Sequence, residues 1–364
     1  MATTNYGTNN ALAVKLWSKR LSVEALKACW LFKFIGESTD SLLQIKDETE
    51  KSAGDQITYG LRMQLSGNGV LGDGTLEGQE EALATYSDAV IINQLRHAVR
   101  SQGRMSQQRV PFSVRDEALS GLRDWWSDRF DYWGFNQLCG NLGPPNAPSG
   151  ATPSAGDVRW TGLNATIGPD ANHYTNVAAS ADDTGLGSTN TFTLALIDKC
   201  VERAKTLTPA IRPIKVKDRS YYAMFLHPYE VTDLRSNTST GQWMDIQKAA
   251  MTGGMVDDNP IFDGSLGAYN GVLLYEDFRV TQGYNPTGDV AISTVRRSVF
   301  CGAQAGMLAF GRDNSENKFT WVEELFDYEN QLGVSAGLIA GLKKTTFNSA
   351  DFATIVASAY AAQH

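Results

Sequence analysis

The first residues that could do chemistry form a glycine motif, Gly67-x-Gly69-x-x-Gly72, which matches the phosphate-binding fingerprint of dinucleotide-binding folds. That fingerprint needs a helix directly after the glycines, because the helix N-terminus holds the pyrophosphate. Here further glycines follow, and then carboxylates that would repel a phosphate: Glu77, Glu80 and Glu81. The motif therefore indicates a flexible hairpin tip and not a nucleotide site.

The histidines and acidic runs form no catalytic or metal-binding pattern. No HExxH or HxH motif occurs, and no cysteine pair stands near any histidine: His97, His173, His227 and His364. The runs Asp182-Asp183 and Asp257-Asp258 lack the spaced ligands of a calcium loop. Local sequence supports no Ser-His-Asp triad either. We therefore expect no catalytic residue, no metal and no cofactor, and a protein that is not an enzyme.

Length, charge and cysteine usage narrow the class further. The chain has 364 residues, which exceeds one typical core and predicts two or three lobes. Its net charge of -8 is unlike that of a dedicated nucleic-acid binder. The polar N-terminus has no signal core, and the apolar run 28–35 is too short to span a bilayer. We expect a soluble protein, made in the cytoplasm, with buried free thiols at Cys29, Cys139, Cys200 and Cys301.

Residues 55–83 carry the clearest structural pattern. Apolar residues alternate with polar or small ones from Ile57 to Leu65, which predicts a half-buried β-strand. After the glycine-rich turn, the chain returns through the acidic residues 77–81, so we expect a long hairpin with an acidic return arm. An isolated two-stranded hairpin is marginal in water, so something else must cover its apolar face.

A long helix is predicted to begin at Ser113, which makes a capping-box-like start with Asp116. Pro144 and Pro145 end any continuation. A helix of about 26 residues spans about 40 Å, which suits a structural spine. One face of this helix carries Trp125, Trp126 and Trp133. Tryptophans at this spacing favour packing in the core or at a subunit interface over a surface that binds carbohydrate or stacks on bases.

The rest of the chain divides into a loop region and a region of alternating helices and strands. Residues 141–190 are rich in Gly, Pro, Ala, Ser, Thr, Asn and Asp, which predicts a long surface excursion. Hydrophobic spacing predicts helices at 191–205, 229–235 and 243–251. It predicts strands at 221–226, 272–275, 295–300, 319–326 and 334–342.

Several motifs, taken in order, resemble major capsid proteins of tailed bacteriophages, in the branch typified by a coliphage that carries a giant virion RNA polymerase. They are 54–65 (GDQITYGLRMQL), 72–83 (GDGTLEGQEEAL), 94–99 (QLRHAV), 115–125 (RDEALSGLRDW) and 227–235 (HPYEVTDLR). The resemblance extends from Lys15 to Thr346 and is weakest over 141–190. It rests on the order and spacing of the motifs together.

The resemblance implies an α+β fold of the HK97-like type and a subunit of an icosahedral head that encloses double-stranded DNA. It implies the following organisation: an N-terminal arm (1–50), an extended hairpin loop (51–85), a peripheral domain with a spine helix (86–140), a surface excursion (141–190), an axial domain (191–340) and a return to the peripheral domain with the tail (341–364). The implied partners are other copies in pentamers and hexamers, portal and scaffolding proteins, and DNA held by weak contacts. A decoration protein is a further candidate.

Within this scheme we expect subunit contacts from the hairpin and the long helix. The residues are Arg62, Glu77, Glu80, Glu81, Trp125 and Trp126, with the acidic ones facing a basic patch on the neighbour. A basic cluster near the start of the chain consists of Lys15, Lys19 and Arg20. Two interpretations of this cluster stay open. It is either the solvated face of an amphipathic helix or a weakly basic arm that faces DNA.

Two variations within the family lead to further expectations. Some HK97-like shells join a lysine of the extended loop to an asparagine of the neighbour. No lysine occurs between Lys51 and Lys199, so we expect a shell without such bonds. Some members carry a long N-terminal scaffolding segment that a protease removes. Only a short arm precedes the hairpin here, so we expect no large cleavage and a separate scaffolding protein.

Three other functions stay open from the sequence. An encapsulin-like compartment has the same fold but encloses an enzyme, and only the resemblance favours a phage shell over it. An unrelated α/β enzyme with an active site built from distant residues is disfavoured by the lack of a catalytic constellation. A decoration or tail protein is usually smaller or dominated by strands, unlike a chain with a predicted spine helix.

Overall fold

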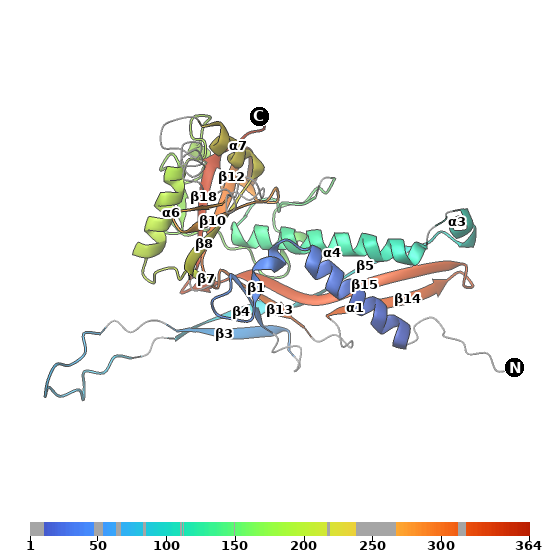
Figure 1. Cartoon of the computed structure of the whole chain (residues 1–364), viewed down its shortest axis with the longest axis horizontal. Coiled ribbons are helices and arrows are strands. Elements are labelled where there is room, and N and C mark those ends of the chain that lie inside the picture. Colours follow the sequence, from blue (N-terminus) through green and yellow to red (C-terminus); the bar gives the residue numbers. More distant parts are fainter. Residues whose placement is uncertain are drawn as a thin grey trace, which may run out of the picture.

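The computed structural model describes most of the chain, and each statement about the fold refers to that part. The described residues are 11–46, 54–62, 67–82, 85–109, 111, 113–148, 150–216, 219–237, 267–311 and 318–364. They form two bodies, each built on a mixed sheet, and an extended loop that leaves the molecule on one side (Figure 1). The helix expected at 243–251 lies outside the described residues.

The first body is a six-stranded sheet, with the strands β1 (Ile35–Gly36), β2 (Leu43–Lys46), β5 (Asn93–Arg100), β13 (Gly306–Phe310), β14 (Phe319–Phe326) and β15 (Gln331–Lys344). The long strand β15 pairs with β14 and β5 along its first part and with β13 along its last part. β2 pairs with β13, and β1 with β2. The sheet therefore joins the N-terminal segment to strands from the last part of the chain.

A long helix, α4 (Val114–Leu138), runs along this sheet (Figure 1). It has 25 residues and begins after Ser113, whose side chain accepts a hydrogen bond from the Asp116 amide, so the predicted start is confirmed. Every residue from Arg129 to Leu138 is buried. A helix that is covered on all sides in this way belongs to the interior, where the two bodies meet.

The N-terminal arm forms α1 (Ala11–Ala28) and a short 3₁₀ helix, η1 (Leu31–Phe34). α1 packs against α4 and β14, with Leu21 and Ala25 buried. Trp17 of α1 stacks on Trp321 of β14, with the ring centroids 5.9 Å apart. The arm thus contains a helix, and Leu21 and Ala25 on it are covered by residues of the same chain.

The second body is an eight-stranded sheet in the upper left of Figure 1. Its central path is β6 (Tyr174–Asn176), β18 (Thr354–Tyr360), β12 (Val290–Cys301), β8 (Arg219–Leu226), β10 (Val272–Glu276) and β9 (Ala268–Tyr269), while β11 (Gln282–Asn285) pairs with β12 and β7 (Ile214–Val216) with β8. The helices α6 (Leu194–Thr206) and α7 (Pro228–Ser236) belong to this body. The strand expected at 221–226 is confirmed, and its burial explains its continuous apolar run.

An aromatic cluster joins the arm, the long helix and the second sheet into one core. Trp30 and Phe34 lie against Phe225 of β8, with ring centroids 5.3 and 5.4 Å away. Phe135 of α4 approaches the same ring at 5.8 Å. Large aromatic side chains bury much apolar area in edge-on contacts like these, so this cluster fixes the two bodies relative to each other.

A separate two-stranded sheet, β3 (Gln56–Arg62) with β4 (Thr85–Ile91), forms the base of the extended loop. The first predicted strand is confirmed. Residues 75–82 of the expected acidic return arm form no strand. Among the described residues, the pairing with β3 runs from Thr85 to Ile91, so the hairpin continues beyond the expected boundary at residue 85. The short elements that remain are α3 (Arg104–Arg109), α5 (Val158–Thr161), η2 (Asp183–Gly185), β16 (Thr346–Phe347) and β17 (Ala350–Asp351).

The division of the chain between the bodies also differs from the expected boundaries. The strands β13, β14 and β15 lie within the expected axial range 191–340, yet they pair in the six-stranded sheet with β2 and β5. The tail 341–364 was expected to return to the spine-helix body. Its strand β18 lies inside the other sheet, between β6 and β12. Strand partners over such separations depend on tertiary contacts, which a local pattern does not specify.

Candidate functional site: the extended loop and surrounding surfaces

The loop 67–82 is the most exposed part of the described chain. All its residues except Val70 are exposed, and it reaches far beyond the two bodies (Figure 1). Its leucines Leu71 and Leu76 are 93% and 59% exposed. The acidic side chains cap the loop's own backbone: Glu81 accepts a hydrogen bond from the Gly67 amide at 2.6 Å, and Glu80 from the Gly78 amide at 2.7 Å. The loop therefore buries neither of its leucines against its own chain.

The base of the loop is held firmly by the six-stranded body. Ile57, Tyr59 and Val90 pack with β13 residues in a small separate core. The Tyr59 hydroxyl donates to Asp88 at 2.9 Å, and Asp88 also pairs with Lys343 of β15. Burial alone would raise the pKa of Asp88, but the hydrogen bonds from Lys343 and from backbone amides lower it. The two strands at the base of the loop are therefore anchored to the six-stranded body.

Asn164 connects this base to the rest of the molecule. Its side chain accepts from the Ile91 amide at 2.9 Å and donates to the carbonyls of Ile91 and Leu342 at 2.9 and 3.2 Å. It thus satisfies backbone groups of β4 and β15 as a neighbouring strand would. Sequence reasoning missed this residue, because an asparagine in a polar loop carries no signal of such a role.

Parts of the segment 141–190, whose composition predicts a surface excursion, are built into the fold. β6 pairs with β18, and Asp183 is fully buried against Arg297 of β12, with Oδ2 and Nε 2.6 Å apart. Asp183 also accepts from the Tyr174 hydroxyl and the Tyr284 amide, at 2.7 and 2.8 Å. Buried polar side chains take the place of apolar ones here, so composition alone was misleading.

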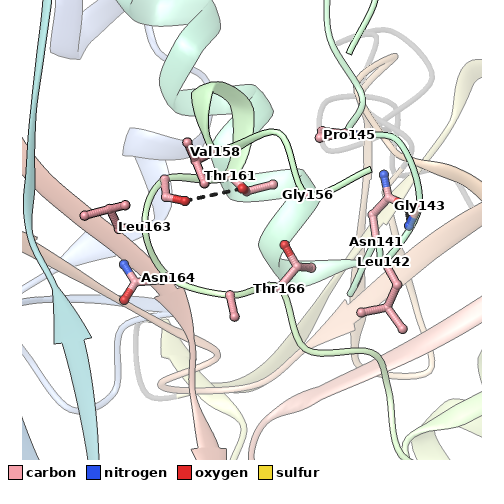
Figure 2. A pocket seen from close by; sticks show the side chains of 12 residues that line it. Asn141, Leu142, Gly143, Pro145, Gly156, Val158, Thr161, Leu163, Asn164 and Thr166 are labelled. Atoms are coloured by element: carbon pink, nitrogen blue, oxygen red, sulfur yellow. Dashed lines mark hydrogen bonds between the residues drawn. The ribbon is translucent and has the colours of Figure 1, made fainter. Parts of the chain in front are cut away.

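A hollow of about 350 Å³ opens at the surface of this segment (Figure 2). Leu142 and Leu163 lie on opposite sides of it, and Val158 and Thr161 line it between them. Both leucines and Val158 are exposed. The lining combines apolar side chains with uncharged polar ones and contains no histidine, cysteine or charged side chain.

An arginine surface lies on β5 and α3, at the end of the molecule opposite the extended loop (Figure 1). We use this name for the exposed residues Arg96, Arg100, Arg104 and Arg109. Arg100 lies over the Phe326 ring, 4.2 Å from its centroid. The adjoining turn also carries Asp327 and Glu329, so the arginines are concentrated on the side of β5 and α3.

The tryptophans of α4 that we expected at an interface differ in their surroundings. Trp126 is fully buried and contacts Phe319 of its own chain, with the centroids 5.1 Å apart. The expectation that it contacts a neighbour is therefore wrong, and core packing applies to it. Trp125 is partly buried, stacks on His97 of β5 at 4.5 Å and carries the Arg129 guanidinium on its ring at 4.5 Å. An interface role for Trp125 stays a prediction.

The expected basic arm and Arg62 are described in part. Lys19 and Arg20 are exposed on α1, and Arg20 donates to Glu24 at 2.9 Å. An ion pair between two residues one helical turn apart is typical of a solvated helix face, which is the first of the two interpretations of the basic cluster. The side chains of Lys15 and Arg62 lie outside the described part of the structure, although Arg62 ends β3.

The described residues provide neither a metal centre nor a membrane helix. No group of His, Cys, Asp or Glu among them could hold a metal ion. In the same part of the chain, no helix combines the length and apolar character needed to cross a bilayer. The cysteines expected to be free and buried are both: Cys29, Cys139, Cys200 and Cys301.

The architecture defines the class of protein. A long helix on one sheet, a second sheet body beside it and an extended loop that projects from an anchored base make up the HK97-like fold of shell-forming subunits. Solved phage capsids have this arrangement. The capsid of Ralstonia phage GP4 superposes with a TM-score of 0.77 at 30% identity, covering 100% of this chain and 99% of that one. The capsid asymmetric unit of cyanophage Pam1 gives 0.70 at 21% identity, covering 100% and 95%.

Sequence comparison gives the family. The family described as phage capsid protein matches residues 5–363, so the chain belongs to that family. The major capsid protein of Pseudomonas phage KPP25 is 29% identical over 374 residues, covering 95% of this chain and 93% of that protein. The chain is accordingly a major capsid protein, a structural component of an icosahedral phage head.

Proposed function

We propose that copies of this chain form the pentamers and hexamers of the head by head-to-tail contacts. In each contact, the extended loop of one copy lies on the arginine surface of the next. The observation that carries this proposal is the exposure of the loop, with Leu71 93% open to water on a segment that has no core of its own. A contact between two different surfaces of the same chain closes into rings when the rotation between copies closes.

Charge and geometry support this pairing. The loop tip carries Glu77, Glu80 and Glu81, and the opposite end of the molecule carries Arg96, Arg100, Arg104 and Arg109. Surface pairs contribute little one at a time, about 0–1 kcal/mol each, but complementary charges set the register of an interface. In this contact, Leu71 and Leu76 would bury apolar surface, and the charged side chains would set the orientation of one copy relative to the next.

The remaining roles follow the same scheme. We assign the eight-stranded body to the five-fold and six-fold axes, and the α4 body to the rest of the shell. The shell would enclose double-stranded DNA through weak, salt-sensitive contacts, since the subunit is acidic overall. Assembly in the host cytoplasm with separate scaffolding and portal proteins, and no enzymatic role, complete the proposal. A decoration protein could use the hollow between Leu142 and Leu163.

Electron microscopy of the purified protein, expressed with and without its neighbouring genes, tests the proposal. The unmodified chain should form closed shells or rings of five and six. DNA in shells taken from infected cells agrees with the proposal, whereas a packaged enzyme would indicate an encapsulin-like compartment.

A charge-reversal pair makes the test specific to the loop. The loop variant carries lysine at Glu77, Glu80 and Glu81. The matched control carries lysine at exposed acidic positions elsewhere: Glu117, Glu202 and Glu276. We expect the loop variant to remain a folded subunit that does not close shells, and the control to assemble. Normal shells from the loop variant would contradict the pairing of the loop with the arginine surface.

A further inference from the structure

A lysine and an aspartate are buried together where the chain passes from the first body to the second. Lys344 ends β15, and Asp351 ends β17 in the short β16–β17 hairpin that follows. Their side chains are 0% and 1% exposed, and Nζ lies 2.6 Å from Oδ1. Ion pairs hidden this completely need further hydrogen bonds to offset the loss of water.

Those further hydrogen bonds are missing. Neither Nζ of Lys344 nor either carboxyl oxygen of Asp351 has a hydrogen-bond partner among the described groups, although Nζ and Oδ1 are close. Burial, the largest influence on both, lowers the pKa of Lys344 and raises the pKa of Asp351. Both shifts favour a neutral amine next to a neutral carboxylic acid, and the neutral amine is the nucleophilic form of lysine.

The adjacent residue on the same strand provides an internal comparison. Lys343 pairs with Asp88, but this pair is partly exposed and well supported. Lys343 also donates to the Ala89 carbonyl, and Asp88 accepts from the Tyr59 hydroxyl and the Thr346 amide. Lys343–Asp88 is thus a conventional ion pair, whereas Lys344 and Asp351 are in fully buried contact without hydrogen-bond partners.

We propose that Lys344 and Asp351 form an isopeptide bond within the same chain. The Lys344 amine attacks the Asp351 carboxyl carbon to form a tetrahedral adduct. The bond from carbon to one carboxyl oxygen then breaks, and that oxygen leaves as water. One of its protons comes from the carboxylic acid and one from the amine. The product is a neutral amide, and no oxidant or other reactant is consumed.

Asp170 is the positioning residue for this reaction. One of its carboxyl oxygens, Oδ2, accepts a hydrogen bond from the Asp351 amide at 3.0 Å and lies 2.9 Å from Nδ1 of His173. It therefore holds β17 in place, and its charge acts to raise the pKa of both Lys344 and Asp351. The bond would close the β16–β17 hairpin covalently at the crossing between the two sheets, without linking different subunits.

The mass of the intact subunit from purified shells tests the proposal directly, without any substitution. We expect the unfolded, reduced chain to be lighter than its sequence by one water. After trypsin digestion, Lys344 should be uncleaved, and fragmentation should show a branched peptide joining Lys344 to Asp351. A subunit with the full sequence mass, or a water loss that maps to another residue, would overturn the inference.

Matched variants test the chemistry. Lys344→Arg removes the amine and should restore the full mass, whereas Lys343→Arg should keep the water loss because Lys343 belongs to the other pair. Asp351→Asn should lose ammonia in place of water, because the leaving group changes. Full mass of the Asp351→Asn variant in well-formed shells would contradict the mechanism.

Asp170→Asn should slow bond formation after refolding, measured as the time course of the mass change, and an unchanged rate would remove its positioning role.

Discussion

Two segments of this chain are both rich in glycine and polar residues, but they differ in how far they pack against the rest of the chain. The loop 67–82 leaves the molecule and has its leucines in water. The segment 141–190 is built into both bodies through Asn164 and Asp183. The difference lies in a few polar side chains that bind backbone or charge elsewhere in the chain. One segment is therefore completed by its own chain, and the other is available for a partner.

This comparison suggests how a shell subunit combines rigidity with assembly. The segment 141–190 stabilises the subunit before it meets another copy. Under the proposed contact, the loop stabilises the shell more than it stabilises the single subunit. Substitutions in the two segments should therefore separate subunit stability from shell stability.

The largest effect is expected at the buried ion pair. Asp183→Ala leaves Arg297 buried without its carboxylate and should lower the free energy of unfolding of the unassembled subunit by about 3–5 kcal/mol. Urea unfolding measures this change. The matched control in the loop is Asp73→Ala, which should leave the unfolding midpoint unchanged because Asp73 is exposed. If both substitutions lowered the free energy of unfolding equally, the proposed difference between the two segments would be wrong.

Asn164→Ala should have the next largest effect. It removes the groups that satisfy Ile91 and Leu342 and should cost about 3 kcal/mol, since each buried polar group left unpaired costs about 1–3 kcal/mol. Asn68→Ala, in the exposed loop, is its control and should cost nothing measurable. Because Asn164 holds β4, the variant should also show faster hydrogen exchange at the root of the loop. Unchanged exchange there would mean that Asn164 does not hold the loop.

A smaller effect should depend on pH. Burial alone would raise the pKa of Asp170, but its hydrogen bonds with His173 and with backbone amides lower it. A carboxyl group with a lowered pKa in the folded state stabilises the protein above its ordinary pKa. This contribution is lost as the pH falls through the lowered value. Asp170→Asn should therefore destabilise the subunit at neutral pH and have little effect in strong acid, which thermal unfolding at several pH values can check.

The smallest effect on the subunit is expected for the loop leucines. Leu71→Ser with Leu76→Ser should change the unfolding free energy of the subunit by less than about 0.5 kcal/mol, as for most exposed positions. Shells should be weakened more, because burying one leucine contributes about 1.5–3 kcal/mol at each repeated contact. The temperature at which shells release DNA measures this. Shells as heat-resistant as the unmodified ones would show that the leucines stay exposed after assembly.

The local sequence pattern was enough to predict several elements of the fold. Ser113 predicts the start of α4, and alternation around Ile57 and Tyr59 predicts β3, because capping and strand periodicity depend on near neighbours. The resemblance of ordered motifs gave the HK97-like fold and the capsid function, which the comparisons confirm. For the loop, the sequence indicated the acidic tip and the need for a cover, but not the strand that closes the hairpin.

The errors share a physical cause, which is that pairing and burial are decided by distant parts of the chain. Trp125 and Trp126 are adjacent and chemically identical, yet only Trp126 is fully buried. The strand β18 could not be assigned to a body from its apolar residues, since both sheets need such strands. The composition of 141–190 predicted a surface loop, because Asn164 and Asp183 look like loop residues until their partners are in place.

The sequence by itself determined the start of the long helix, several of the longer strands, the exposed acidic loop tip and the family, because these depend on local spacing and on ordered motifs. The tertiary structure alone decided which strands share a sheet, that Asp183 meets Arg297, and that Lys344 lies against Asp351 away from water. Charges and polar groups can be buried only where the fold brings a partner to them. Such partners are separated along the chain, so only the folded structure identifies them.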